Sequence, residues 1–382
     1  MRNARTVAVA AFLAGTAACG HGESTSAAPA PSTNAGDARA TGSSFDGQPF
    51  AITLADDGMI RVAGIALAPS GEEAFLTVID PAGTAERRVT HTPFPNQVWL
   101  GGTVDTLGQG YVLSCPYMFR PTLPLPPGSA CWTVKLTDAG VPWRVALALH
   151  SITPAGDGGI YGIAAEVVEP DGAVSGLGNS LSLVDAQGHV VWKKPVVFPA
   201  SGQAYLTQLA RRDDGDLLVL AQISDTPWIA RFSPDGDLRA TMRLDLAGSL
   251  PSMISPAHGD GAYVIVNMPS KHETDLVRVG VDGALAWTRA LGNELAAALA
   301  VAPDDGVAVA IGTFGNAAGQ IAHFDATGAA VGATNVPADI DVGVLTFDSA
   351  GHLYAAGNLQ PRTLGSGRGY VQQLGAESSL MP

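Results

Sequence analysis

Three short segments of the chain place two aspartates directly before a glycine, and paired carboxylates are candidate metal ligands. The segments are Asp56-Asp57-Gly58, Asp213-Asp214-Gly215 and Asp304-Asp305-Gly306. Calcium takes several carboxylate and carbonyl oxygens, and a calcium-binding loop alternates its acidic residues and ends on a downstream glutamate. None of the three segments continues in that way, and Asp and Gly are also the residues that tight hairpin turns prefer. We therefore interpret these segments as turns and predict no metal site in them.

The histidines and the catalytic motifs give no stronger signal. No two histidines stand four residues apart on an expected helix, although histidines from different parts of the chain could still converge in space. The chain has no Gly-x-Ser-x-Gly nucleophile turn, no phosphate-binding Walker loop and no Ser-x-x-Lys motif. The sequence predicts no catalytic residue, no metal and no cofactor. The histidines are His21, His91, His150, His189, His258, His272, His323 and His352.

The elements that must position these residues recur with a period of about 47 residues, which is the range of propeller repeats. The marker is Asp-x-x-Gly or a close variant, at residues 80–83, 137–140, 185–188, 233–236, 280–283 and 325–328, with a weaker form at Leu374-Gly375. A second glycine series keeps the same period, with Gly58, Gly110, Gly159, Gly215, Gly261, Gly306 and Gly351. Such a period in a strand-rich chain predicts an all-β fold, a seven-bladed β-propeller of four-stranded antiparallel blades.

The composition agrees with many short strands that are joined by tight turns. The chain has 46 glycines and 26 prolines, 15% charged residues and 46% hydrophobic residues. Glycine supplies the positive φ that turns need, and the apolar fraction is large enough for a substantial core. Global disorder is therefore excluded.

The sixth repeat shows the expected pattern of four strands, at residues 295–302, 307–312, 320–324 and 329–336. The first two are apolar runs, as expected for strands between neighbouring blades. The expected fourth strands carry charged residues that protect an exposed outer edge against aggregation: Arg87, Arg88, Lys193, Lys194, Arg239, Arg243 and Arg289. Tryptophans recur on the same strand, at Trp143, Trp192 and Trp287. The seventh repeat lacks a clear fourth strand, and we expect residues 41–47 to supply it and close the ring.

Two segments share an Asp-containing turn, a glycine and then a tryptophan: residues 184–192 (Val-Asp-Ala-Gln-Gly-His-Val-Val-Trp) and 281–287 (Val-Asp-Gly-Ala-Leu-Ala-Trp). This pattern resembles the repeats of quinoprotein-like propellers. Residues 229–236 (Ile-Ala-Arg-Phe-Ser-Pro-Asp-Gly) resemble the SBBP repeats of bacterial exported propellers. The resemblance covers most of the repeat region and implies the fold. Its motif describes turn geometry, so it implies no particular chemistry.

The N-terminus is typical of an export signal. Residues 1–18 have an early positive charge, a short apolar run and small residues before Cys19. Small residues before a cysteine resemble the lipobox of bacterial lipoproteins, although Thr16 replaces the usual leucine, and the alternative is ordinary cleavage after Ala18. We predict lipidation of Cys19, a flexible Ala/Ser/Thr/Pro/Gly tether over residues 19–44, and a propeller over residues 45–382. Gly20 in place of an aspartate favours the outer membrane.

The two remaining cysteines, Cys115 and Cys131, flank a proline-rich stretch. In an oxidising compartment we expect them to form a disulfide at the base of a loop. Closing a loop of about 15 residues contributes about 3 kcal/mol in the chain-entropy model. The alternative is a pair of buried free thiols.

A net charge of −14 makes nucleic acid an unsuitable partner. We expect a monomer that contacts the membrane only through its N-terminal lipid.

One face of the propeller should carry most of the long connections, and variable loops on a rigid scaffold commonly bind partners. The leading hypothesis is a non-catalytic binding or scaffold module for an envelope protein or glycan. The alternative is an enzyme that uses the central channel, such as a quinone-dependent dehydrogenase, a lyase or a hydrolase. The candidate contact residues on that face are Tyr117, Phe119, Arg120, Trp132, Lys271, His272, Glu273, Arg362 and Arg368.

Overall fold

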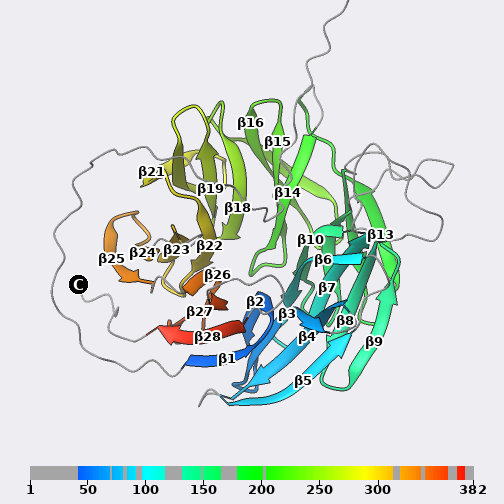
Figure 1. The fold of residues 1–382 in the computed structure, drawn as a ribbon. Coiled ribbons are helices and arrows are strands. Elements are labelled where there is room, and N and C mark those ends of the chain that lie inside the picture. Colours follow the sequence, from blue (N-terminus) through cyan, green and yellow to red (C-terminus); the bar gives the residue numbers. More distant parts are fainter. Residues whose placement is uncertain are drawn as a thin grey trace, which may run out of the picture. The chain divides into compact units, whose positions relative to one another are not determined.

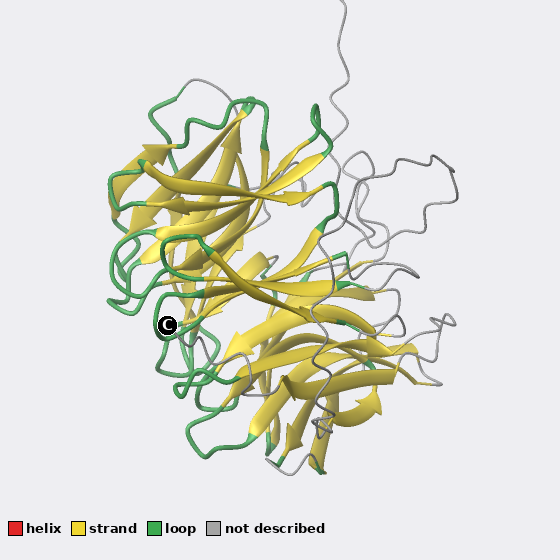
Figure 2. Cartoon of the chain, turned by 90° about the vertical axis from the view of Figure 1, so that its left-hand side faces the viewer, coloured by secondary structure: helices red, strands yellow, loops and turns green. Residues whose placement is uncertain are grey.

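Seven four-stranded antiparallel sheets form the blades of a ring (Figure 1). The computed structural model describes residues 42–68, 71–80, 84–91, 97–116, 131–147, 149–164, 179–200, 204–312, 319–336, 340–359 and 368–374. These residues form strands and turns (Figure 2), and among them no helix is long and apolar enough to cross a membrane. The prediction of an all-β, seven-bladed propeller is confirmed.

Each blade runs from an inner first strand at the ring axis to an outer fourth strand. Blade 1 consists of β2 (Gln48–Leu54), β3 (Ile60–Ala68), β4 (Gly71–Ile79) and β5 (Ala85–His91). Blade 2 consists of β6 (Gln97–Val104), β7 (Gly110–Pro116), β8 (Trp132–Thr137) and β9 (Gly140–Val145). Blade 3 consists of β10 (Leu149–Pro154), β11 (Ile160–Ala164), β12 (Ser180–Val184) and β13 (Val190–Pro195). Blade 4 consists of β14 (Ala204–Arg211), β15 (Leu217–Ile223), β16 (Thr226–Phe232) and β17 (Leu238–Arg243). Blade 5 consists of β18 (Leu250–Pro256), β19 (Ala262–Met268), β20 (Glu273–Val279) and β21 (Leu285–Gly292). Blade 6 consists of β22 (Ala296–Val301), β23 (Val307–Ile311), β24 (Gln320–Phe324) and β25 (Ala330–Asn335). Blade 7 consists of β26 (Ile340–Phe347), β27 (Leu353–Leu359), β28 (Arg368–Leu374) and β1 (Gly42–Asp46).

The N-terminal strand β1 closes the ring, as the sequence predicts. It pairs antiparallel with β28, from Gly42 opposite Gln372 to Asp46 opposite Arg368. Phe45 is buried and packs edge-on against Phe75 of blade 1, with the ring centroids 5.7 Å apart. Blade 7 therefore contains both ends of the folded chain, and its outer strand also packs against the next blade.

The hydrophobic core is divided among the seven interfaces between neighbouring blades. One buried apolar cluster lies at each interface, including the interface between blades 7 and 1 that the closing strand completes. The second strands are buried on both sides, and every residue of β11 and β23 is buried. This explains why these strands are continuous apolar runs rather than alternating patterns. No blade buries its apolar faces without two neighbours.

Every inner strand contains a β-bulge at the same place. The register of the first strand against the second slips by one residue at Phe50, Leu100, His150, Thr207, Ser252, Ala297 and Gly343. A bulge bends its strand and increases the local twist. Side chains next to these bulges link neighbouring inner strands. Ser151 Oγ accepts a hydrogen bond from Leu209 N at 3.0 Å, and Gln208 Oε1 accepts one from Ile254 N.

The outer-strand tryptophans pack on the turn of the following blade. A Cβ added to Gly188, Gly236 or Gly328 would lie 2.6 to 2.8 Å from the nearest ring atom of Trp143, Trp192 or Trp287 respectively. Trp143 Nε1 also donates to Ala186 O at 2.8 Å, and Trp287 Nε1 donates to Ala326 O at 3.1 Å. In the β20–β21 turn of blade 5, Gly283 lies against Met242 of β17 in the same way. The Asp-x-x-Gly turn thus has a second role, because its glycine provides a flat surface for the neighbouring outer strand.

The second glycine series does not mark one conformation. Four of its members adopt positive φ, namely Gly58, Gly215, Gly261 and Gly351. In blades 2 and 3, the positive φ is found at Gly108 and Gly158 rather than at Gly110 and Gly159. In blade 6, Asp305 takes this position with a φ of 69° in place of Gly306. Aspartate tolerates the left-handed region better than most residues, which permits the substitution.

Gly328 and Gly351 allow the contact with tryptophan to be separated from backbone strain. Their φ values are 81° and 85°, but only Gly328 lies against a ring, and nothing is within 4 Å of a Cβ on Gly351. Alanine at either position should cost about 1 kcal/mol in backbone strain. Gly328→Ala should cost about 1–3 kcal/mol more, because the added methyl group displaces Trp287.

The measurement is the free energy of unfolding in urea for both variants. Equal losses would contradict a structural role for the tryptophan contact.

Candidate functional site

A cavity of about 280 Å³ lies at one mouth of the central channel, where four inner strands end. It is formed by the ends of β14, β18, β22 and β26 and the turns that follow, and therefore by blades 4 to 7. First-to-second turns follow these strand ends, and we call this side of the ring the turn face. The lining residues are Arg211, Asp213, Ser255, Pro256, Ala257, His258, Leu299, Ala300, Val301, Leu345, Thr346 and Phe347.

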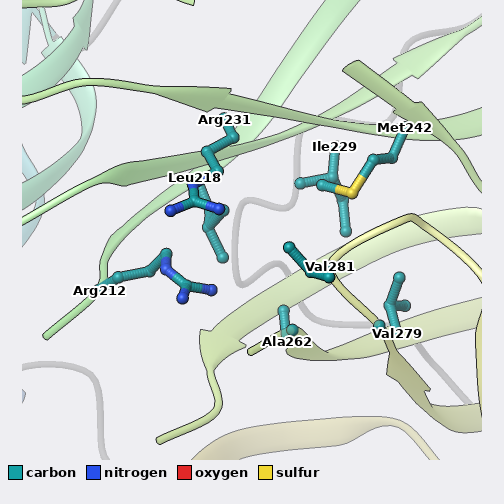
Figure 3. Close-up of a pocket in the computed structure, with 10 residues that line it drawn as sticks. Arg212, Leu218, Ile229, Arg231, Met242, Ala262, Val279 and Val281 are labelled. Carbon is teal, nitrogen blue, oxygen red and sulfur yellow. The ribbon is translucent and has the colours of Figure 1, made fainter. Parts of the chain in front are cut away.

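A second cavity, between blades 4 and 5, is far smaller (Figure 3). It measures about 10 Å³ and is lined by apolar side chains such as Leu218, Ile229 and Val279, with Arg212 and Arg231 at its edge. A volume of this size is about that of one water probe, so it is a packing gap rather than a ligand site.

Arg211 is the one arginine among the described residues that line the channel-mouth cavity. Its side chain is exposed and makes no hydrogen bond or ion pair with any residue that the structure describes. Its guanidinium lies against the turn of blade 3, because a Cβ on Gly156 would be 3.0 Å from Arg211 Nη1. The next residue, Arg212, behaves differently. Its side chain is 6% exposed, and it donates to Gly259 O at 2.7 Å in the next blade.

His258 and Asp213 form a polar pair across blades 4 and 5 at the same mouth. His258 Nδ1 lies 2.9 Å from Asp213 Oδ2, and the backbone N of His258 donates to Asp305 Oδ1 at 2.6 Å. A carboxylate at Nδ1 favours the proton on that nitrogen and leaves Nε2 as the acceptor of the neutral ring. The side chains of His258 and Asp213 are 46% and 75% exposed, so the pair is accessible.

The aspartates of the turn face serve mainly as structural groups. Asp57, Asp214 and Asp304 each accept a hydrogen bond from a backbone N two residues later, at 3.0 Å. The interpretation of the acidic pairs as turns therefore has direct support. Within the described ranges, no group of three or more His, Cys, Asp or Glu side chains is arranged to hold a metal ion.

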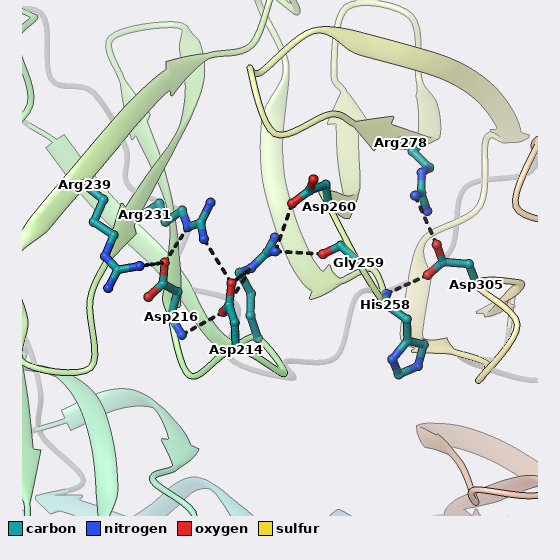
Figure 4. A network of polar contacts seen from close by, with 10 residues as sticks. Asp214, Asp216, Arg231, Arg239, His258, Gly259, Asp260, Arg278 and Asp305 are labelled. Carbon is teal, nitrogen blue, oxygen red and sulfur yellow. Dashed lines mark hydrogen bonds and ion pairs between the residues drawn. The ribbon is translucent and has the colours of Figure 1, made fainter.

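Arginines neutralise several of these carboxylates and connect the blades (Figure 4). Asp216 is buried, and it accepts from Arg231 Nε at 2.5 Å and from Arg239 Nη1 at 2.8 Å. Arg278 Nη2 lies 3.2 Å from Asp305 Oδ2. In blade 1, Arg61 forms a bidentate pair with Asp57 at 2.6 and 2.7 Å. These side chains have structural partners, whereas Arg211 has none among the described residues.

The opposite face carries the second-to-third connections, and their lengths differ widely. They are short in blade 1 (69–70), blade 4 (224–225) and blade 5 (269–272). In blade 1, however, the two strands that lead to the connection are nine residues long, against five to seven in the other blades. The long connections of blades 2, 3, 6 and 7 are residues 117–131, 165–179, 312–319 and 360–367. We call this side the long-connection face.

The predicted contact residues on that face come from separate blades. Trp132 begins β8 and lies under the guanidinium of Arg144, 5.5 Å from the ring centroid. Lys271 and His272 are exposed in the β19–β20 turn, where His272 has a φ of 52°, and Glu273 begins β20. Arg368 begins β28 and donates to Ser44 Oγ at 3.1 Å. Tyr117, Phe119, Arg120 and Arg362 lie outside the described residues.

The predicted disulfide is compatible with the strand register but stays a prediction. Ser114 of β7 pairs with Trp132 of β8, so one further step in this register brings Cys115 opposite Cys131. Directly opposed residues of antiparallel strands have Cα atoms 4.5–5.5 Å apart, which is within the range of disulfides. Cys131 is buried, and the side chain of Cys115 lies outside the described residues. Residues 1–41 are also outside them, so the signal, Cys19 and the tether up to residue 41 stay predictions. Residues 42–44, which the sequence assigned to the tether, belong to strand β1 and pair with β28.

Sequence reasoning did not find the channel-mouth site. In the sequence, Asp213 belongs to an acidic turn, His258 is one of eight histidines, and Arg211 belongs to no motif. All three residues lie at or just after the end of the first strand of their repeat. This shared position was the one signal in the sequence that could have predicted their proximity.

Comparison with known proteins agrees with the fold and goes no further. No family model matches the chain, and no curated protein matches it in sequence. Among solved structures it is similar to prolyl oligopeptidase B from Galerina marginata in its apo form, with 12% identity over 86% of this chain and 50% of that chain and a TM-score of 0.53. It is also similar to a puromycin hydrolase mutant complexed with PGG, with 16% identity over 87% of this chain and 52% of that chain and a TM-score of 0.52.

The chain spans about half the length of both of these proteins. At such identities the likeness shows the fold alone. The fold places this chain in the class of seven-bladed β-propellers.

The Asp57–Arg61 pair predicts a specific dependence of stability on pH. The hydrogen bond from Arg61, followed by that from Met59 N, lowers the pKa of Asp57 from 3.8 to about 2. Because the folded-state pKa is the lower one, the pair stabilises the fold above pH 4, and this contribution is lost as the pH falls to about 2. Asp57→Asn should remove at most about 1 kcal/mol at pH 7, since the Asp57 side chain is 51% exposed.

Urea unfolding at pH 7 and at pH 2.5 tests this expectation, with Asp56→Asn as the matched control in the same turn. A deficit of Asp57→Asn that is equally large at both pH values would contradict it.

Proposed function

We propose that this propeller is a non-catalytic binding module that presents its long-connection face to an envelope protein or glycan. The observation that carries the proposal is the difference between the two faces. The turns of the turn face are short, and several of their aspartates accept hydrogen bonds from the backbone of their own turn, whereas the opposite face holds connections of very unequal length. A rigid scaffold with variable connections on one side is the usual arrangement of a binding surface.

The arrangement of the connections favours a partner that covers part of this face. Blades 6, 7, 1, 2 and 3 follow one another around the ring, and each has either a long second-to-third connection or, in blade 1, an extended β3–β4 hairpin. Blades 4 and 5 have short second-to-third connections, and the strands that lead to these connections are seven residues long, against nine in blade 1. A partner would therefore rest on the arc from blade 6 to blade 3, with Lys271 and His272 of blade 5 beside it.

The proposal includes export and a lipid on Cys19, which would tether a monomer to the bacterial outer membrane. It rests on the sequence of the N-terminus. The acidic net charge of −14 disfavours nucleic acid as a partner. The flexible tether would let the ring reach a partner beyond the lipid headgroups.

Crosslinking in intact cells, followed by capture through a tag at Pro382, tests the binding face. Replacement of residues 117–130 by a Gly-Ser segment should abolish capture of the partner, because the largest connection of blade 2 is removed. The matched variant replaces residues 165–178 in blade 3 in the same way and shows whether the partner extends across both blades. Both variants must melt at the temperature of the parent protein. A partner that both variants still capture would contradict the proposed face.

Cell fractionation tests the anchor. Cys19→Ser should move the protein from the membrane to the soluble fraction and abolish incorporation of labelled palmitate, because the thiol that accepts the lipid is gone. Cys131→Ser retains Cys19 and should keep both properties. Palmitate labelling that persists in Cys19→Ser would refute lipidation at this residue.

A further inference from the structure

We propose that the cavity at the channel mouth binds a short zwitterionic peptide with apolar side chains. Its carboxylate would pair with Arg211, its ammonium group would face Asp213, and its side chains would lie against the apolar lining. This site is at the turn face, so the proposal does not depend on the binding role of the long-connection face.

The carboxylate end of the ligand is assigned from Arg211. Other arginines at the turn face, such as Arg61, Arg212 and Arg278, are bound to carboxylates of the scaffold. Arg211 has no such partner among the described residues, yet the backbone at Gly156 leaves room for its guanidinium. A guanidinium binds a carboxylate through two parallel hydrogen bonds, which sets both charge and orientation.

The ammonium end is assigned to Asp213, which lines the cavity together with Arg211. Arginines pair with several carboxylates of the surrounding turns, such as Asp57, Asp216 and Asp305. Asp213 has no arginine partner among the described residues, and its Oδ2 lies 2.9 Å from His258 Nδ1. Its side chain is 75% exposed, so one carboxylate is available to a cationic group of the ligand. A ligand with both charges can therefore pair with Arg211 and with Asp213.

The size and the apolar lining define the rest of the ligand. Pro256, Ala300, Leu345 and Phe347 contribute apolar surface, and Ser255 and Thr346 add hydroxyl groups that can bind peptide groups. The cavity of about 280 Å³ is near the lower limit of small-molecule sites, about 300 Å³. This volume suits a dipeptide rather than a long chain.

Isothermal titration calorimetry of the full chain with leucyl-leucine tests the proposal, with N-acetyl-leucyl-leucine and leucyl-leucinamide as probes that each lack one charge. Arg211→Gln should weaken leucyl-leucine binding about tenfold, as expected for the loss of a charged hydrogen-bonded pair. The parent protein should bind leucyl-leucinamide about tenfold more weakly than leucyl-leucine, because the amide lacks the carboxylate. The Arg211→Gln variant should bind leucyl-leucine and leucyl-leucinamide with equal affinity. Asp213→Asn should weaken leucyl-leucine but leave the N-acetyl form unchanged.

Arg243→Gln is the control, because Arg243 is an exposed arginine on the outer strand β17 and does not line the cavity. It should bind leucyl-leucine like the parent protein. Two results would overturn the proposal: no heat of binding at millimolar leucyl-leucine, or equal affinities of the parent protein and Arg211→Gln. Equal binding of the dipeptide, its amide and its N-acetyl form would overturn it as well, since an apolar cavity alone would give that result.

Discussion

The whole structure depends on the burial of apolar blade faces against one another around a closed ring. Each interface between blades contains one buried cluster of described residues, so every blade is stabilised from two sides. Such a ring is stable only when it is closed, because an open end would expose two apolar faces to water. The pairing of β1 with β28 supplies this closure and joins residues that are more than 300 positions apart in the chain.

Closure also explains why so many polar residues of the turn face are structural. Each turn must end a strand, reverse the chain and meet the neighbouring blade within a few residues. Aspartate side chains bind the backbone of their own turn, while arginines such as Arg212 connect to the following turn. The glycine of the third-to-fourth turn provides the contact surface for a tryptophan. On the long-connection face, the lengths of the second-to-third connections differ from blade to blade.

Adjacent residues at the turn face can have different roles for geometric reasons. Arg211 and Arg212 follow one another in the chain, yet Arg212 is fixed between blades 4 and 5 whereas Arg211 lies at the channel mouth. The same holds for aspartates, since Asp216 is buried between two arginines and Asp213 is exposed beside His258. Residue type alone does not separate the structural groups from those that are available to a ligand.

Much of the architecture could be predicted from the sequence, because the propeller is a repeated local pattern. The period of the Asp-x-x-Gly turns predicted the number of blades, and apolar runs such as Val307–Ile311 marked the buried second strands. The outer position of Trp143, Trp192 and Trp287 and the closing role of the N-terminal segment were also predicted correctly. The positive φ of Asp305 was not expected, since glycine is the usual residue there.

The repeat, the turns and the strands follow from the amino-acid sequence, because each of these depends on interactions within about 50 residues of chain. Which polar side chains meet at the channel mouth depends on the packing of the blades in three dimensions. Arg211, His258 and Phe347 come from three different blades, and they line one cavity because ring closure fixes the positions of the inner strands around a common axis. A local pattern carries no information on that convergence, which arises from the packing of whole blades against one another.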